Sequence, residues 1–433
     1  MSETESQQRS LRSAAPGLHT PESSTRPVRN TRAVIEYAEP HFREARDQGL
    51  IDVYGRSANG RTILLERGDY AGQAVVDFVR CSYLGLDNHP DVIAGAVAAL
   101  EQYGSLHWSC ARTRLNFGLI GDLEEELSDL FDARVITYSS VLAANMGALP
   151  LIASGHLTGG RKPLMVFDRL AHATLAFHKA AVAEETQVVT IPHNGLDELE
   201  RLCKQNDVVA YICDGVYSMG GAAPVDALRG LQERYGLFLY IDDAHGISLF
   251  GQQGEGYVRS QLSGAVGDRT IIAASLGKGF GASGGLIMLG TGHQEALFRS
   301  FAVAHAFSAS PNLAAVGAAL GSSQLHRTSE PGDRRCKLWD NVRLFDSILP
   351  TEQKGEKLPI RVVEIGDEHQ AISAGRILLE AGHYVSVIFF PTVARGKAGL
   401  RICITASHSD DEVDQVARAV LKILNRSSTD GGA

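Results

Sequence analysis

Hydrophobic and polar positions follow one another in blocks that predict alternating strands and helices through the middle of the chain. Several of the strand-like runs are apolar at every position, which is typical of a parallel sheet covered on both faces. This alternation predicts an open α/β sheet with its functional site at the carboxyl ends of the strands. The runs are Val135–Tyr138, Leu164–Phe167, Val188–Ile191, Val208–Cys213, Phe238–Ile241, Ile271–Ala274 and Leu286–Leu289.

The pattern changes on either side of this block. A helix over 31–49 and two strands, Ile63–Leu65 and Ala74–Val79, precede it, and a helix capped by Asp87 or Asn88 opens the main unit. After about residue 325 we expect charged linkers around a long helix and then a small α+β unit. Its expected elements are the linkers Arg327–Arg335 and Pro350–Lys357, the strands Arg361–Ile365, Tyr384–Phe390 and Leu400–Ala406, and the helices Gln370–Glu380 and Glu412–Leu424 with Ser409 as N-cap.

The pattern therefore predicts an α/β protein with a mostly parallel central sheet flanked by helices and a smaller α+β C-terminal domain. The predicted division is a disordered tail over 1–30, a helix and strands over 31–80, a large domain over 81–325, a small domain over 326–425 and a tail over 426–433.

Composition and charge narrow the possible functions. The 433 residues carry a net charge of −9, which makes nucleic acid an unexpected partner. There is no run of 18 apolar residues and no apolar core for a secretory signal, so we expect no membrane span and a cytoplasmic location. The six cysteines are scattered, which favours reduced thiols, and no clustered ligands predict a metal site.

Lys278 is the first candidate for chemistry. It follows the apolar run Ile271–Ala274 and lies among Gly277, Gly279 and Gly281. Packing at a strand end would desolvate the amine and lower its pKa, and a neutral amine attacks carbonyl groups. The pattern fits a Schiff-base lysine, although a lone Lys-Gly pair is more often a surface lysine in a flexible loop.

Two aspartates and a histidine follow another apolar strand about thirty residues earlier. Asp242, Asp243 and His245 come directly after Phe238–Ile241. An aspartate at such a strand end can hold the proton of a pyridinium nitrogen. Neighbours on a strand face opposite ways, so the pattern leaves open which aspartate points inward, and capping of the next turn is an alternative use for both.

Together, SLGKGFG and DDAHG resemble the α-oxoamine synthases, a family of fold-type-I enzymes that depend on pyridoxal 5′-phosphate (PLP). The resemblance covers nearly the whole chain from about residue 74. It implies that Lys278 binds PLP covalently and removes the substrate α-proton, that Asp242 binds the pyridine nitrogen, and that His245 contacts the phenolic oxygen. DRLAHATL resembles the segment whose histidine stacks on the PLP ring, which assigns His172.

Further cofactor contacts are implied by shorter matches. DGVYSM implies a hydrogen bond from Ser218 to the phenolic oxygen, and FSASP implies that Ser308 reaches the phosphate of a neighbouring subunit. YSSVLAANMGA resembles the phosphate turn, with Val141 and Leu142 where the family has Gly followed by an aromatic residue. By the same resemblance, Asn145 is the retained asparagine of that turn, and Ser275 is a second phosphate donor.

Three residues are expected to contact substrate. GLRICITASH resembles the C-terminal signature whose arginine holds the amino-acid carboxylate, which assigns Arg401. RTRLNFG aligns Arg114 with a family arginine whose role we leave open. Ser82 stands where the family has Asn or Asp before Tyr-Leu-Gly, and Cys81 precedes it.

The resemblance implies a homodimeric acyltransferase that condenses an amino acid with an acyl thioester, from coenzyme A or an acyl carrier protein, and releases carbon dioxide. Another fold-type-I reaction, such as transamination or carbon–carbon cleavage, is the first alternative. A non-catalytic α/β nucleotide-binding protein is the second. The identity of the amino acid and of the acyl chain does not follow from the sequence.

Overall fold

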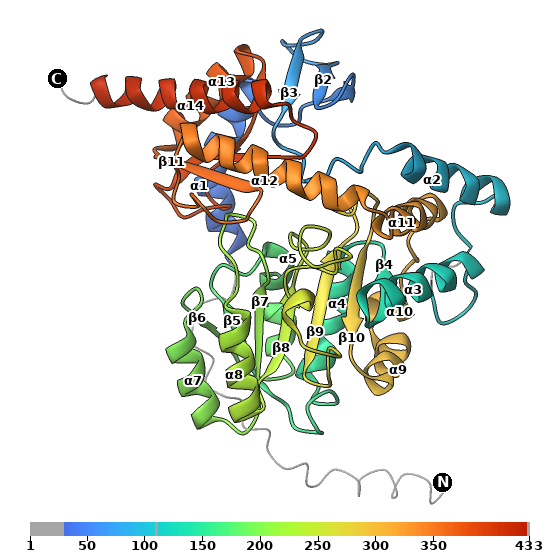
Figure 1. Ribbon diagram of the computed structural model, residues 1–433. Helices are drawn as coiled ribbons and strands as arrows, with labels where there is room; N and C mark the ends of the chain where they lie inside the picture. The colour runs from blue at the N-terminus through green and yellow to red at the C-terminus, as the bar shows by residue number, and fades with distance from the viewer. Residues whose placement is uncertain (1–29, 109–110, 431–433) are drawn as a thin grey trace, which may run out of the picture.

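The computed structural model describes residues 30–108 and 111–430, and a seven-stranded sheet lies at its centre (Figure 1). Strands β5 to β9 are parallel to one another, and β10 pairs antiparallel with both β4 and β9. The order across the sheet is β4 (Arg134–Tyr138), β10 (Gly285–Leu289), β9 (Thr270–Ser275), β8 (Phe238–Asp242), β7 (Val209–Asp214), β5 (Leu164–Asp168) and β6 (Val188–Ile191). The predicted mostly parallel α/β sheet is confirmed.

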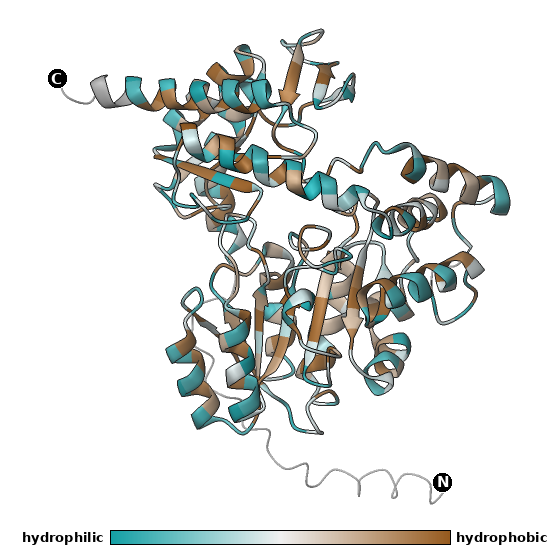
Figure 2. Ribbon diagram, viewed as in Figure 1, coloured by the Kyte–Doolittle hydropathy of each residue, from teal (hydrophilic) through white to brown (hydrophobic). Residues whose placement is uncertain are grey.

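Helices cover both faces of this sheet, which explains its uniformly apolar strands (Figure 2). One face packs against α2 (Pro90–Tyr103), α3 (Gly118–Phe131), α7 (Leu196–Gln205), α8 (Val225–Tyr235) and α11 (Leu313–His326). The other packs against α4 (Val141–Ala153), α5 (Ala173–Ala176), α6 (Lys179–Ala183), α9 (Gly292–Phe301) and α10 (Val303–Ala306). A 3₁₀ turn spans Arg259–Gln261.

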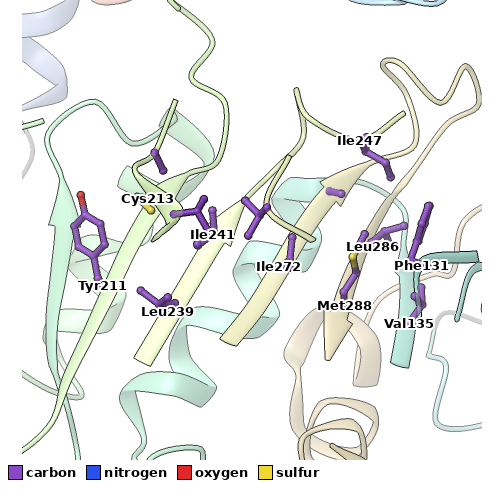
Figure 3. Close-up of a cluster of buried hydrophobic side chains, with 14 of the residues drawn as sticks. Phe131, Val135, Tyr211, Cys213, Leu239, Ile241, Ile247, Ile272, Leu286 and Met288 are labelled. Atoms are coloured by element: carbon purple, nitrogen blue, oxygen red, sulfur yellow. The ribbon is translucent and has the colours of Figure 1, made fainter. Parts of the chain in front are cut away.

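Alternate residues of β8 belong to opposite faces. Leu239 and Ile241 lie in the cluster drawn in Figure 3, on the α3 and α8 side. Phe238 and Tyr240 lie in the cluster on the α4 side. Successive side chains of a strand alternate, so Asp242 continues the α4 side of the sheet.

The smaller unit lies beyond one end of the central sheet (Figure 1). Helix α12 (Glu330–Ile348) leads into it, and its antiparallel sheet has the order β11 (Ile360–Gly366), β14 (Ala398–Cys403), β13 (Ser386–Ile388). Helix α13 (Glu368–Glu380) packs on this sheet, and α14 (Asp410–Asp430) packs against α12 and α13.

The N-terminal elements join this smaller unit. Helix α1 (Thr31–Asp47) packs on α13, and the strand β3 (Ala74–Asp77) pairs with β12 (His383–Tyr384). The strands β1 (Gly55–Ser57) and β2 (Thr62–Leu65) extend the same sheet. The predicted division of the chain at residues 80 and 325 stays a prediction.

Several predicted boundaries were wrong. Helix α12 begins at Glu330 because Pro331 fits a first helical turn, so most of the expected linker Arg327–Arg335 is helix. The expected strand Tyr384–Phe390 is broken into β12 and β13. Helix α14 continues to Asp430, past the expected start of the tail at 426, whereas its capping by Ser409 is confirmed.

The remaining differences are local. The residue that caps α2 is His89, whose ring accepts from Asp91 N, rather than Asp87 or Asn88. The tail predicted over 1–30 lies outside the described residues apart from Asn30, which caps α1. Within 30–108 and 111–430, no helix is long and apolar enough to cross a membrane, and no three His, Cys, Asp or Glu side chains group as metal ligands.

Candidate active site

A cavity of about 330 Å³ lies at the carboxyl ends of β8 and β9, beside the first turn of α4. This is where an open α/β sheet is expected to place its site. Seven of the predicted site residues line it: Val141, Leu142, His172, Asp242, His245, Ser275 and Lys278. Ser139, Ser140, Thr174, Asp214 and Ser283 contribute further polar groups to the lining.

Lys278 is held against His245 inside this cavity. Its Nζ lies 2.8 Å from Nε2 of His245, and Nδ1 of the same ring lies 2.6 Å from the Tyr83 hydroxyl. Burial lowers the pKa of Lys278, with the carboxylate of Asp242 opposing that effect. Burial also lowers the pKa of His245 well below its usual value, and Lys278 adds to the effect. The pair is therefore suited to exchanging a proton rather than to holding two positive charges.

Glycines allow the loop of Lys278 to pack this tightly. A Cβ on Gly279 would lie 2.8 Å from the carbonyl oxygen of Ile247. Gly281 has a φ of +76°, and a Cβ there would lie 2.4 Å from the Cβ of Leu86. Close packing therefore requires Gly279 and Gly281 beside the lysine, whereas a flexible surface loop would place no such requirement on these positions.

Asp242 is oriented by a network of buried amides. Its Oδ1 accepts from the backbone N–H of Ala244 (3.1 Å), and its Oδ2 accepts from Nδ2 of Asn145 (3.2 Å). The Tyr240 hydroxyl donates to Oδ1 of Asn145 (2.6 Å), which fixes the amide. Asn145 does not line the cavity itself but orients Asp242 through this hydrogen bond.

Asp243 points to the other side of the strand. Its Oδ2 accepts from the backbone N–H of Val258 (3.0 Å), and its Oδ1 has no hydrogen-bond partner among the described residues. Burial raises the pKa of Asp243 to about 8, so this carboxyl is largely protonated at neutral pH. The choice left open by the sequence is thereby resolved in geometry, because only Asp242 faces the cavity.

His172 lies at the start of α5 and lines the same cavity. Its Nδ1 accepts from the backbone N–H of Thr174 (3.3 Å), so the ring also caps the helix. Its own backbone N–H donates to Oδ1 of Asp214 (3.2 Å). Burial lowers the pKa of His172, and burial together with Asp242 raises the pKa of Asp214 well above its usual value.

The opposite wall can accept an anion. Helix α4 begins at Val141 after the N-cap Ser140, whose hydroxyl accepts a hydrogen bond from the backbone N–H of Ala143. The backbone N–H groups of Val141 and Leu142, which line the cavity, have no partner within the helix and can bind an anion. Gly285 permits β10 to approach this turn, since a Cβ there would lie 2.4 Å from the backbone N of Val141. An amine, a carboxylate and a helix N-terminus around one cavity fit the aldehyde, pyridine nitrogen and phosphate of PLP.

Arg401 extends from β14 toward residues of both units. Its Nε donates to the carbonyl oxygen of Ser218 (2.8 Å), and its Nη2 lies 3.6 Å from Sγ of Cys81. Ser218 therefore contributes its backbone to this contact. Ser82 is buried with its hydroxyl accepting from Nη1 of Arg61 (2.7 Å), which directs it away from the cavity lining.

Two predicted residues lie on the surface of this chain. Arg114 is exposed, and the neighbouring Arg112 is the buried arginine, with Nη1 2.8 Å from Oε1 of Glu124. Ser308 is partly exposed between α10 and α11, beside Phe307, which is 79% exposed. Neither Arg114 nor Ser308 lines the cavity.

Sequence reasoning missed several residues that complete the site. Tyr83 belongs to the Tyr-Leu-Gly segment, Thr174 to HATL and Asp214 to DGVYSM, so the motifs contained them without indicating their contacts. Tyr240 had no signal at all, because a buried strand with no polar face gives no hint that one hydroxyl meets Asn145.

Comparison with known proteins agrees with the geometry. Residues 75–420 match the model of the aminotransferase class I and II family, and the chain belongs to that family of PLP-dependent enzymes. Two similar proteins are 8-amino-7-oxononanoate synthases. The one from Coprothermobacter proteolyticus is 30% identical over 88% of this chain and 95% of its own, and the one from Alkaliphilus metalliredigens is 32% identical over 81% and 88%.

Solved structures show the same fold. A serine palmitoyltransferase from S. paucimobilis with bound PLP has a TM-score of 0.80 at 22% identity and covers 93% of this chain and 100% of its own. An 8-amino-7-oxononanoate synthase from Francisella tularensis has a TM-score of 0.68 at 21% identity, covering 82% and 99%.

These relatives place the chain among the α-oxoamine synthases, as the sequence motifs predicted. The predicted PLP dependence, fold-type-I architecture and acyltransferase class are confirmed. The reaction type is the PLP-dependent decarboxylative condensation of an amino acid with an acyl thioester. The names of the relatives argue against transamination, and the family argues against a non-catalytic nucleotide-binding protein.

Proposed function

We propose that Lys278, His245 and Asp242 carry out a decarboxylative condensation between an α-amino acid and an acyl thioester, with coenzyme A or a carrier protein as the thiol. The observation that carries the proposal is the 2.8 Å contact between Nζ of Lys278 and Nε2 of His245 in a cavity that also contains Asp242. PLP, when bound, supplies an electron sink for the negative charge that develops at the α-carbon.

The chain's own groups divide the remaining work. Lys278 binds the cofactor covalently through its amine and afterwards acts as the base that takes the α-proton, which its lowered pKa favours. Asp242 keeps the pyridine nitrogen protonated, and Asn145 keeps Asp242 oriented. His245, kept neutral by burial, would contact the phenolic oxygen of the bound cofactor and relay a proton to Lys278. His172, which lines the cavity, would stack on the cofactor ring.

Arg401 is the proposed partner of the amino-acid carboxylate. Arg401 is 8% exposed as a residue, and its Nε donates to the Ser218 carbonyl, which orients the remaining N–H groups of the guanidinium. A buried planar fork of this kind matches a carboxylate in two parallel hydrogen bonds. Ser82 supports this end of the site indirectly, through the loop that it shares with Cys81 and Tyr83.

A reductive labelling experiment tests the assignment of Lys278. Borohydride treatment of the PLP-loaded protein followed by peptide mapping should place the cofactor on Lys278. Lys278→Ala should retain no cofactor covalently after borohydride treatment and should release neither thiol nor carbon dioxide from a mixture of amino acids and acyl thioesters. Lys179, another half-buried lysine beyond the cavity lining, provides the control, and Lys179→Ala should stay active. A label on any other lysine would refute the assignment.

We further propose a cytoplasmic homodimer that shares its active sites. Large apolar side chains lie exposed beside α10, in the cavity lining and in the segments 113–117 and 169–177, as a subunit interface requires. They are Leu115, Leu142, Leu170, Phe177, Phe301 and Phe307. Ser308, beside the most exposed of them, would then reach the partner's cofactor phosphate.

Sedimentation tests the dimer. Phe307→Asp should shift the protein to a monomer of low activity, because a charge would be buried in the interface. Ile35→Asp alters another large apolar residue, which is 57% exposed on α1, and should leave both properties unchanged. A fully active monomeric wild-type protein would contradict the proposal.

A further inference from the structure

Two cysteines lie together beside the proposed carboxylate-binding arginine. Sγ of Cys81 is 3.9 Å from Sγ of Cys403 and 3.6 Å from Nη2 of Arg401. Cys81 comes from the segment between β3 and α2, and Cys403 ends β14, so the contact joins positions 322 residues apart. No metal-ligand group includes them, and neither has a role in the proposed reaction.

We propose that Cys81 and Cys403 are an oxidation site, at which a hydroperoxide converts the two thiols into a disulfide next to Arg401. The inference goes beyond the proposed function and does not depend on it, because the sulfur chemistry needs neither PLP nor substrate.

The backbone around Cys81 holds this residue beside Cys403. The N–H of Cys403 donates to the carbonyl oxygen of Phe78 (2.8 Å), and the N–H of Ala406 donates to that of Tyr83 (2.8 Å). Cys81 therefore lies between two points at which its segment is tied to the segment of Cys403. Residues 78–82 have no helical or strand structure, so a side-chain rotation and a small backbone shift can close the gap to a bond of about 2 Å.

The surroundings divide the two thiols into an attacking and a resolving partner. The hydrogen bond from Cys403 lowers the pKa of Cys81, and Arg401 lowers it further. The same hydrogen bond raises the pKa of Cys403, which keeps its proton. Cys81 is partly exposed, whereas Cys403 is fully buried, so a peroxide meets the thiolate first.

The chemistry balances in two steps. The Cys81 thiolate attacks one oxygen of hydrogen peroxide, the O–O bond breaks, and a sulfenic acid and hydroxide form. The Cys403 thiol then attacks the sulfenic sulfur, the S–O bond breaks, and a disulfide and water form. Overall, two thiols lose two electrons and two protons, and one peroxide is reduced to two waters. A dithiol reductant reverses the change.

Peptide mapping by mass spectrometry tests the site on the purified protein without added PLP. One equivalent of hydrogen peroxide should produce a Cys81–Cys403 cross-linked peptide, with a loss of two hydrogens that dithiothreitol restores. Cys403→Ala should instead accumulate sulfenic or sulfinic acid on Cys81. Cys336→Ala removes an exposed cysteine outside the pair and should behave as wild type.

The pattern of oxidation decides the outcome. Wild-type protein that forms no Cys81–Cys403 peptide, or that oxidises at Cys336 before Cys81, would overturn the proposal. Cys403→Ala should keep wild-type activity before oxidation and should lose the cross-link, which separates loss of the disulfide from loss of the fold.

A second experiment connects the oxidation of Cys81 and Cys403 to the proposed function. A carboxylate on Arg401 would neutralise the charge that favours the Cys81 thiolate, so a mixture of amino acids lacking cysteine should slow oxidation of the PLP-loaded enzyme several-fold. Arg401→Gln should slow it without any amino acid. Cross-linking that amino acids do not slow would count against carboxylate binding at Arg401, whereas failure to cross-link at all would count against the oxidation site.

Discussion

The contact between Tyr83 and His245 gives the sharpest test of how the site is held. Tyr83→Phe removes one hydroxyl from a side chain that is fully buried, and it leaves Nδ1 of His245 without its 2.6 Å partner. An unsatisfied buried polar group costs about 1–3 kcal/mol. His245 stays neutral because burial holds its pKa well below the usual value. Removing the Tyr83 hydroxyl should therefore change the tautomer and the orientation of the ring rather than its charge.

The orientation of the His245 ring decides whether its Nε2 presents a proton or a lone pair to Lys278. With Nδ1 fixed by Tyr83, Nε2 meets Nζ of Lys278 in one defined state at 2.8 Å. In Tyr83→Phe we expect kcat/KM to fall by about 5- to 150-fold, which corresponds to the same 1–3 kcal/mol. The pH dependence of kcat/KM should also move, because Lys278 loses a fixed neighbour. PLP content should stay near that of the wild type.

A second tyrosine separates this effect from simple destabilisation. The Tyr211 hydroxyl donates to Oδ2 of Asp168 (2.8 Å) and is equally buried, but neither residue lines the cavity. Tyr211→Phe should lower the melting temperature by a similar amount and leave kcat/KM and its pH profile unchanged. If Tyr83→Phe lowers the melting temperature while retaining the wild-type pH profile and kcat/KM, the hydroxyl is structural only and the reasoning fails.

Three further predictions use other parts of the site and the core. Asp242→Asn should lose most cofactor absorbance at low micromolar PLP, whereas Asp243→Asn should keep it, because only Asp242 faces the cavity; the reverse result would contradict the assignment. Arg401→Ala should lower kcat/KM for the amino acid by about 30-fold or more, from the roughly 2–5 kcal/mol that a desolvated charge partner is worth, with PLP content intact by absorbance. Stability should fall as the pH drops from about 6.5 towards 4. Burial lowers the pKa of His326 from 6.5 to about 4 in the folded chain, so the unfolded chain takes up the proton first, at a cost of about 3 kcal/mol by pH 4. His326→Gln should flatten this part of a melting-temperature profile, and an unchanged slope would count against it.

The central sheet was predictable because its strands carry a strong and simple signal. Runs such as Phe238–Ile241 are apolar throughout, and burial on both faces requires that. The same uniform pattern could not show which way Asp242 and Asp243 point, because a strand that is apolar on both faces does not indicate which residues face the site. Strand β1 was missed because it carries no apolar pattern. Its residues Gly55–Ser57 are all exposed, and they form a strand by pairing with β2.

Contacts between segments that are distant along the chain could not be predicted from the sequence. Ser82 was expected at the substrate, but its hydroxyl accepts from Arg61, 21 residues earlier. Tyr83 meets His245 across 162 residues. Local motifs identified the reactive groups Lys278, Asp242 and His245, whereas their supporting partners depend on how separate elements pack, which no spacing along the chain records.

The loop 78–83 shows why those supporting contacts matter for the reaction. Arg61 and Asp77 form a buried ion pair (2.6 Å) at its base, and breaking such a pair costs about 3–5 kcal/mol. Strand β3, which ends at Asp77, pairs with β12 of the smaller unit, so the loop is anchored to the same body as Arg401. Tyr83 then contacts His245, which follows β8 of the large sheet. The smaller unit therefore carries both the proposed carboxylate partner and the group that orients His245. A change in its position relative to the sheet would alter amino-acid binding and proton transfer together, while the cofactor contacts of α4, β8 and β9 would stay in place.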